Sequence, residues 1–117
     1  MQPYEQLAAW QRAHAMTLVV YRVTESWPTS ERYNLTAQTR RASVSVPANI
    51  AEGSAKRGKR EFRRYLDIAL GSLAEVSYLL RLACDLSLLS EAAWVEAEGA
   101  RDAAARVTWL LYRSMAS

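Results

Sequence analysis

The chain has 117 residues, of which 50% are apolar and 23% charged, and its formal net charge at pH 7 is +3. This composition excludes a disordered or fibrous protein, and the length fits one domain, residues 1–117, that buries about two-thirds of its unfolded surface. The single cysteine, Cys84, excludes an internal disulfide, and the N-terminus lacks the basic-then-apolar layout of a secretion signal. We therefore expect a soluble, cytoplasmic protein without a membrane-spanning segment.

The first predicted helix covers residues 5–26. One face of it carries apolar residues at alternating spacings of four and three: Ala9, Ala13, Met16, Val20, Val23 and Trp27. Leu18 and Tyr21 lie beside or behind this stripe, so the apolar face is wide. Pro28 ends the segment, because the residue before a proline is pushed out of the helical region.

A second helix is predicted over residues 31–54. Pro47 lies inside it and lacks the N–H that would bond to the Ser43 carbonyl, so we expect a kink at this position. A break with a restart at Pro47 is the alternative. Gly53 and the run from Ser54 to Gly58 are expected to mark the end of the helix, because glycine tolerates the left-handed conformation of a helix cap.

Basic residues are concentrated between residues 40 and 64. This window holds eight cations and two acids, a local charge of 8 − 2 = +6, so the rest of the chain sums to −3. A local positive field attracts polyanions, although a solvated face that keeps the protein soluble is the competing interpretation. The candidate nucleic-acid-binding residues are Arg40, Arg41, Lys56, Arg57, Lys59, Arg60, Arg63 and Arg64. For the mid-helix pair Arg40 and Arg41, pairing with acids such as Glu75 and exposure to the interior of a ring remain open.

The third helix, predicted over residues 59–86, has the clearest pattern. Its apolar residues recur at spacings of four and three over three heptads: Phe62, Leu66, Ala69, Leu73, Val76, Leu80 and Ala83. This is the seam of a helix packed at a shallow angle in a bundle. Gly71 costs roughly 1 kcal/mol of helix propensity relative to alanine. We expect this cost to be compensated by close approach to the small side chains of the second helix at Ala42, Ser45 and Ala48.

A fourth helix is predicted over residues 91–115, with Ser90 as its N-cap. Four helices joined by short loops predict an all-α fold, an antiparallel up-down-up-down four-helix bundle. Two of the helices have apolar faces broader than one bundle core requires. We therefore expect copies of the chain to associate into an oligomer.

Catalytic, metal and cofactor sites are not expected. Asn49 and Glu52 share one helix face, and we interpret them as partners for backbone groups freed at Pro47 and at the start of the third helix. Glu52 as a general base is disfavoured, because no nucleophile or second carboxylate is placed beside it in the sequence. The only histidine, His14, is not part of a Glu-x-x-His pair. The four tryptophans are interpreted as packing residues rather than as groups that stack on bases.

The run from Gln38 to Gly53, QTRRASVSVPANIAEG, resembles the core motif of small four-helix-bundle proteins called 23S rRNA intervening-sequence proteins. Their relatives include the accessory variability proteins of diversity-generating retroelements. Trp27-Pro28 and the run from Ala69 to Glu75, ALGSLAE, agree with this likeness, which covers roughly residues 5–90. The resemblance implies a bundle that assembles into a ring, typically a pentamer, with a basic surface. In the retroelement branch it also implies binding to nucleic acid and to a reverse transcriptase.

These observations predict a non-enzymatic, ring-forming helical bundle that binds nucleic acid through its basic surface, as an accessory factor, with RNA favoured slightly over DNA. The alternative is an oligomeric protein-binding scaffold whose positive charge recruits an acidic protein partner. The salt dependence of binding to a nucleic-acid probe discriminates between the two, because contacts to phosphates release counterions.

Overall fold

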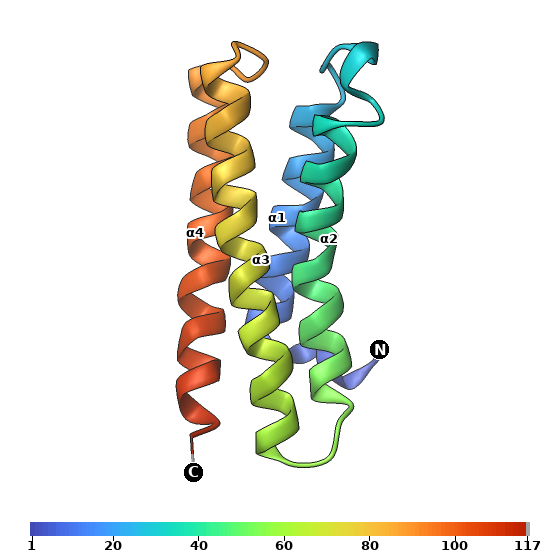
Figure 1. The fold of residues 1–117 in the computed structure, drawn as a ribbon. Helices are drawn as coiled ribbons and strands as arrows, with labels where there is room; N and C mark the ends of the chain where they lie inside the picture. The colour runs from blue at the N-terminus through green and yellow to red at the C-terminus, as the bar shows by residue number, and fades with distance from the viewer. Residues whose placement is uncertain (117) are drawn as a thin grey trace.

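Four long helices make up the chain in a computed structural model, which describes residues 1–116 (Figure 1). They are α1 (Ala8–Thr24), α2 (Leu35–Ser54), α3 (Lys59–Asp85) and α4 (Glu91–Ser114). Each helix packs against the helices that precede and follow it in the sequence, and α4 closes the bundle against α1. The predicted all-α four-helix bundle is thereby confirmed.

The first two helices begin later than the sequence pattern predicts, because a short 3₁₀ turn precedes each of them. These turns are η1 (Pro3–Gln6), which is followed by an extended residue, Leu7, and η2 (Thr29–Glu31). The last two helices begin at the predicted residues, 59 and 91, and end within one residue of the predicted positions. Ser90 caps α4, since its hydroxyl accepts a hydrogen bond from the backbone N–H of Ala93 at 3.1 Å.

The periodic apolar residues form one continuous core between the four helices. The apolar stripe predicted for the first helix is buried throughout, from Ala9 to Trp27. The seam predicted for the third helix is buried from Leu66 to Ala83, and only Phe62 at its start is half-buried. The largest side chains that are fully buried come from α1, α2 and α3: Met16, Val20, Val46, Ile50, Leu66, Leu73, Val76 and Leu80.

Helix α2 continues through Pro47, so a break with a restart at this residue is the wrong alternative. The Ser43 carbonyl, which a proline at position 47 leaves without its helical donor, accepts a hydrogen bond from the Thr17 hydroxyl of α1 at 2.9 Å. The prediction that Asn49 and Glu52 serve the freed backbone groups is therefore wrong. The Asn49 side chain donates to the Ser45 carbonyl at 2.7 Å, and the Glu52 side chain is exposed.

The close approach between α2 and α3 occurs at Gly53 and not at Gly71, which corrects the sequence prediction. Gly71 is exposed, and no atom lies within 4 Å of the position that a Cβ would take there. The reason is helical phase, because Gly71 falls between the buried seam residues Ala69 and Leu73 and so points away from the core. At Gly53, a Cβ would lie 2.7 Å from the Cβ of Tyr65.

Gly53 also remains inside α2 instead of forming a left-handed cap. The glycine with a positive φ, +85°, is Gly58, at the end of the α2–α3 loop, where it precedes the first residue of α3. The small-residue contact expected between the second and third helices does exist one residue beyond Gly71. There the Ser45 and Ser72 hydroxyl oxygens lie 2.9 Å apart.

Candidate nucleic-acid interface

Six of the eight cationic residues singled out in the sequence lie at one end of the bundle. This end holds the α2–α3 loop and the first turns of α3, and in Figure 1 it is the lower end, where both chain termini also lie. We call it the cationic end, and its residues are Lys56, Arg57, Lys59, Arg60, Arg63 and Arg64. Five of these residues are exposed, so their charges face solvent, and the sixth, Arg63, is half-buried.

Arg40 and Arg41 lie elsewhere, near the start of α2. Fifteen residues separate Arg41 from Lys56, which places them about 22 Å apart along the helix axis at 1.5 Å per residue. The eight residues therefore do not make one continuous patch, although they are close in the sequence.

The Arg40 side chain of α2 binds to residues of α1. Its Nε donates to the Thr24 hydroxyl at 2.8 Å, and a terminal nitrogen donates to the Tyr21 carbonyl at 3.3 Å. The guanidinium also lies 4.6 Å from the centroid of the Tyr21 ring. The expected ion pair with an acid such as Glu75 is absent among residues 1–116, because α1 supplies oxygen acceptors and an aromatic face instead. Arg40 is thus a structural residue, while Arg41 is exposed.

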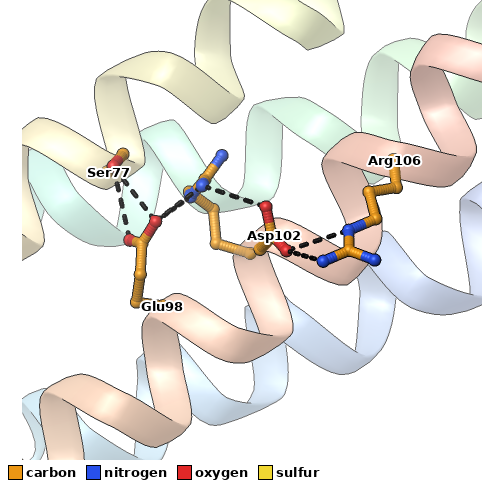
Figure 2. A network of polar contacts seen from close by, with 5 residues as sticks. Ser77, Glu98, Asp102 and Arg106 are labelled. Atoms are coloured by element: carbon orange, nitrogen blue, oxygen red, sulfur yellow. Dashed lines mark hydrogen bonds and ion pairs between the residues drawn. The ribbon is translucent and has the colours of Figure 1, made fainter.

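Elsewhere on the bundle, four arginines are neutralised by neighbouring acids. On the α3–α4 side, Arg101 pairs with Glu98 at 2.6 Å, and Arg106 pairs with Asp102 at 3.0 Å. The Ser77 hydroxyl of α3 donates to Glu98 at 3.3 Å, so the network connects the two helices (Figure 2). Arg22 and Arg81 form further ion pairs, with Glu96 and Asp85. These arginines are already engaged with carboxylates.

In the described part of the chain, the cationic end gathers cations without a neutralising acid into the short segment from Lys56 to Arg63. Within residues 1–116, Arg64 is its only member within ion-pair distance of a carboxylate, that of Glu61 at 3.4 Å. The hydrogen bond that Arg64 donates to Glu61, together with the negative charge of Glu61, raises the pKa of the Arg64 guanidinium above its ordinary value. The other five cations carry charge that no neighbouring side chain offsets.

A groove of about 440 Å³ opens between the start of α3 and the end of α4. Four members of the cationic end line it, together with two acids and two residues of α4: Lys59, Arg60, Glu61, Arg63, Arg64, Asp67, Tyr112 and Met115. The Arg63 guanidinium lies 4.3 Å from the centroid of the Tyr112 ring, which fixes its orientation. Its Nε is buried and has no hydrogen-bond partner among residues 1–116.

Two aromatic residues of α4 extend this groove, and the sequence pattern did not identify them as part of a site. Tyr112 stacks on Trp109, with ring centroids 5.5 Å apart and an angle of 21° between the planes. Trp109 is 48% exposed, whereas Trp27 is buried and the other two tryptophans are half-buried against the core. The interpretation of the tryptophans as packing residues thus holds for three of the four. The predicted antiparallel topology could have placed Tyr112 and Trp109 near this site, because it brings the last turns of α4 beside the first turns of α3.

Apolar side chains are exposed on both helix pairs, α1–α2 and α3–α4. Some lie beside a groove of about 500 Å³ between α1 and α2, where Leu18 and Val44 are 58% and 42% exposed. Exposed apolar side chains also occur on α3 and α4, among them Tyr78 and Leu110, which are 62% and 60% exposed. Both sets of side chains agree with the broad apolar faces of the sequence pattern.

Metal-binding and membrane-spanning features were searched for in the same part of the chain. Among residues 1–116, no cluster of three or more His, Cys, Asp and Glu residues is placed to hold a metal ion. His14 stacks on Trp10, with ring centroids 4.8 Å apart. None of the described helices combines the length and apolar character needed to cross a membrane.

Comparison with known proteins gives one family. A family model described as "23S rRNA-intervening sequence protein" matches residues 5–107, which are 103 of the 117 residues. The match covers all of α1, α2 and α3 and most of α4. A search of curated proteins found no match.

Proposed function

Because the chain belongs to the family of 23S rRNA-intervening sequence proteins, we propose that it is a non-enzymatic helical bundle that binds nucleic acid through its cationic end. The observation that carries this proposal is the concentration, among the described residues, of unpaired cations at one end of the molecule. Arginines such as Arg22, Arg81 and Arg101 are paired with carboxylates, whereas five cations around the α2–α3 loop have no acid partner within residues 1–116. Unpaired, solvent-facing cations are what phosphate backbones neutralise.

The proposed assembly is a closed ring of identical subunits, with five as the expected number. The support is the exposed apolar side chains on α1–α2 and on α3–α4, which would be covered by neighbouring copies. Rotation about a ring axis keeps equivalent atoms at one height, so all cationic ends would lie on the same side. A few phosphate contacts per subunit would then add up along one strand. A monomer mass by light scattering at micromolar concentration would contradict the ring.

The experiment compares two variants that lose the same charge from different places. The loop variant carries Lys56→Gln, Arg57→Gln, Lys59→Gln and Arg60→Gln, all at exposed positions. The control variant carries Arg22→Gln, Arg32→Gln, Arg81→Gln and Arg106→Gln, which are also exposed but lie outside the cationic end. Binding to a structured RNA and to duplex DNA is measured for both variants and the wild type at several salt concentrations.

The loop variant should bind more weakly and with a flatter salt dependence, since each lost phosphate contact removes roughly 0.7–0.9 from the slope of log affinity against log salt. The control variant should keep most of the wild-type affinity. Equal losses in both variants would show that net charge acts without a defined site. Feeble binding by the wild type at low salt would instead favour the alternative function, an oligomeric scaffold that recruits an acidic protein. A reverse transcriptase is a candidate for this partner, because it is the partner implied by the resemblance to the accessory proteins of retroelements.

A further inference from the structure

We propose that the groove between α3 and α4 binds unpaired nucleotides, with one base stacked on Trp109 and the neighbouring phosphates held by Lys59, Arg60 and Arg63. This inference rests on the proposed function and deepens it, because it specifies single-stranded nucleic acid as the ligand. It comes from the α4 side of the cationic end, which the charge pattern of the sequence does not reveal.

The first support is a stack of three side chains across the two helices. The Arg63 guanidinium of α3 lies 4.3 Å from the centroid of the Tyr112 ring, and Trp109 stacks on the same ring with a centroid distance of 5.5 Å. Each planar group in the stack restricts the next, so Trp109 is held in one orientation before any ligand arrives. A preorganised aromatic surface loses little conformational entropy when it binds a base.

The second support is the combination of an exposed ring with a cationic groove. Trp109 is 48% exposed and therefore has surface available to a base. The adjacent groove of about 440 Å³ falls within the range of roughly 300–1,000 Å³ that is usual for ligand sites. Its lining carries four cations and two acids, a charge of 4 − 2 = +2. Proteins that bind single strands use this arrangement, a positive groove for the backbone beside aromatic rings for the bases.

The chemistry of the groove favours an unpaired nucleic-acid strand over a duplex and over an apolar protein surface. A duplex keeps its bases stacked inside, so it offers phosphates to Lys59 and Arg60 but only its end base pairs to Trp109. An apolar protein surface could cover Trp109, but it would also desolvate the cations beside it without neutralising them. A single strand satisfies both parts of the site, since it carries one phosphate and one accessible base per nucleotide.

The test measures binding of a fluorescein-labelled RNA strand of about 12 nucleotides, and of the same strand annealed to its complement, at one low salt concentration. Trp109→Leu should weaken binding of the single strand by about 5- to 100-fold, the loss expected for one stacked base, and leave binding of the duplex unchanged. Trp109→Phe should retain most of the affinity, because phenylalanine keeps an aromatic face. Tyr33→Leu, at an exposed aromatic residue between η2 and α2 at the opposite end of the bundle, is the control and should leave both affinities unchanged.

Three results would overturn the inference. If Trp109→Leu leaves single-strand affinity intact while the loop variant loses it, the proposed function stands and the stacking site does not exist. If Trp109→Leu lowers the oligomer mass in light scattering, Trp109 is a contact between subunits. If the wild type binds neither form of the RNA, the proposed function and this inference fail together. Circular dichroism of each variant establishes that the helices are intact.

Discussion

Substituting Gly53 by alanine tests the packing of α2 against α3 more directly than any other single change. A Cβ added there would lie 2.7 Å from the Cβ of Tyr65 and 3.0 Å from a ring carbon of Phe62. The Tyr65 Cβ is attached to the backbone of α3, so it cannot move away unless the helix itself shifts. Overpacking of this kind costs about 1–3 kcal/mol, and the higher helix propensity of alanine recovers about 1 kcal/mol. The expected net effect runs from about zero to a destabilisation of about 2 kcal/mol.

Gly71→Ala is the matched control, because Gly71 also lies within a helix but has open space around it. Alanine should stabilise the protein there by about 0.5–1 kcal/mol through helix propensity alone. The assay is thermal unfolding followed by circular dichroism, with all proteins at one concentration, since association makes Tm depend on concentration. For a domain of this size, 1 kcal/mol corresponds to about 3–6 °C. Gly53→Ala should therefore leave Tm unchanged or lower it by up to about 12 °C, whereas Gly71→Ala should raise it by about 2–6 °C.

The reasoning about the interface fails if both variants change Tm in the same direction by similar amounts. Equal stabilisation would mean that α2 and α3 have room for a methyl group at Gly53. Equal destabilisation would mean that Gly71 also packs closely against a neighbour.

Three further changes probe other contacts by the same unfolding assay. Thr17→Val removes the donor to the Ser43 carbonyl and should cost about 1–3 kcal/mol, and wild-type stability would show that this carbonyl finds another partner. Ser90→Ala removes the N-cap of α4 and should cost about 0.5–2 kcal/mol, so an unchanged Tm would contradict the capping role. Arg22→Ala breaks an ion pair with Glu96 whose side chains are 58% and 48% exposed, and it should cost at most about 1 kcal/mol. A larger loss would mean that Arg22 has a structural role besides this pair.

The sequence predicted the helices and the core well because helical periodicity is a local property. The stripe from Ala9 to Trp27 and the seam from Leu66 to Ala83 are buried as their spacing indicates. The same periodicity contained the information that Gly71 points outward, between two seam residues. The prediction for Gly71 was wrong because it relied on the low helix propensity of glycine, which was interpreted as a sign of close packing, and not on this periodicity.

Contacts between distant residues could not be predicted in the same way. Thr17 lies 26 residues from Ser43, and no local pattern connects a threonine in one helix with a proline in the next. The charge run was visible in the sequence, but the length of α2 places Arg41 far from Lys56 and so divides the predicted surface. Tyr112 and Trp109 join the cationic end only because the bundle is antiparallel.

The salt dependence of nucleic-acid binding by the wild-type protein tests the central claim most directly. If the cationic ends of a ring make about 6–10 phosphate contacts in total, affinity for duplex DNA should fall roughly 10³- to 10⁵-fold between 50 and 200 mM salt. A plot of log affinity against log salt should be straight, with a slope of about −5 to −9. An affinity that is already feeble at 50 mM, or that hardly changes over this range, would contradict a phosphate-binding role for the cationic end.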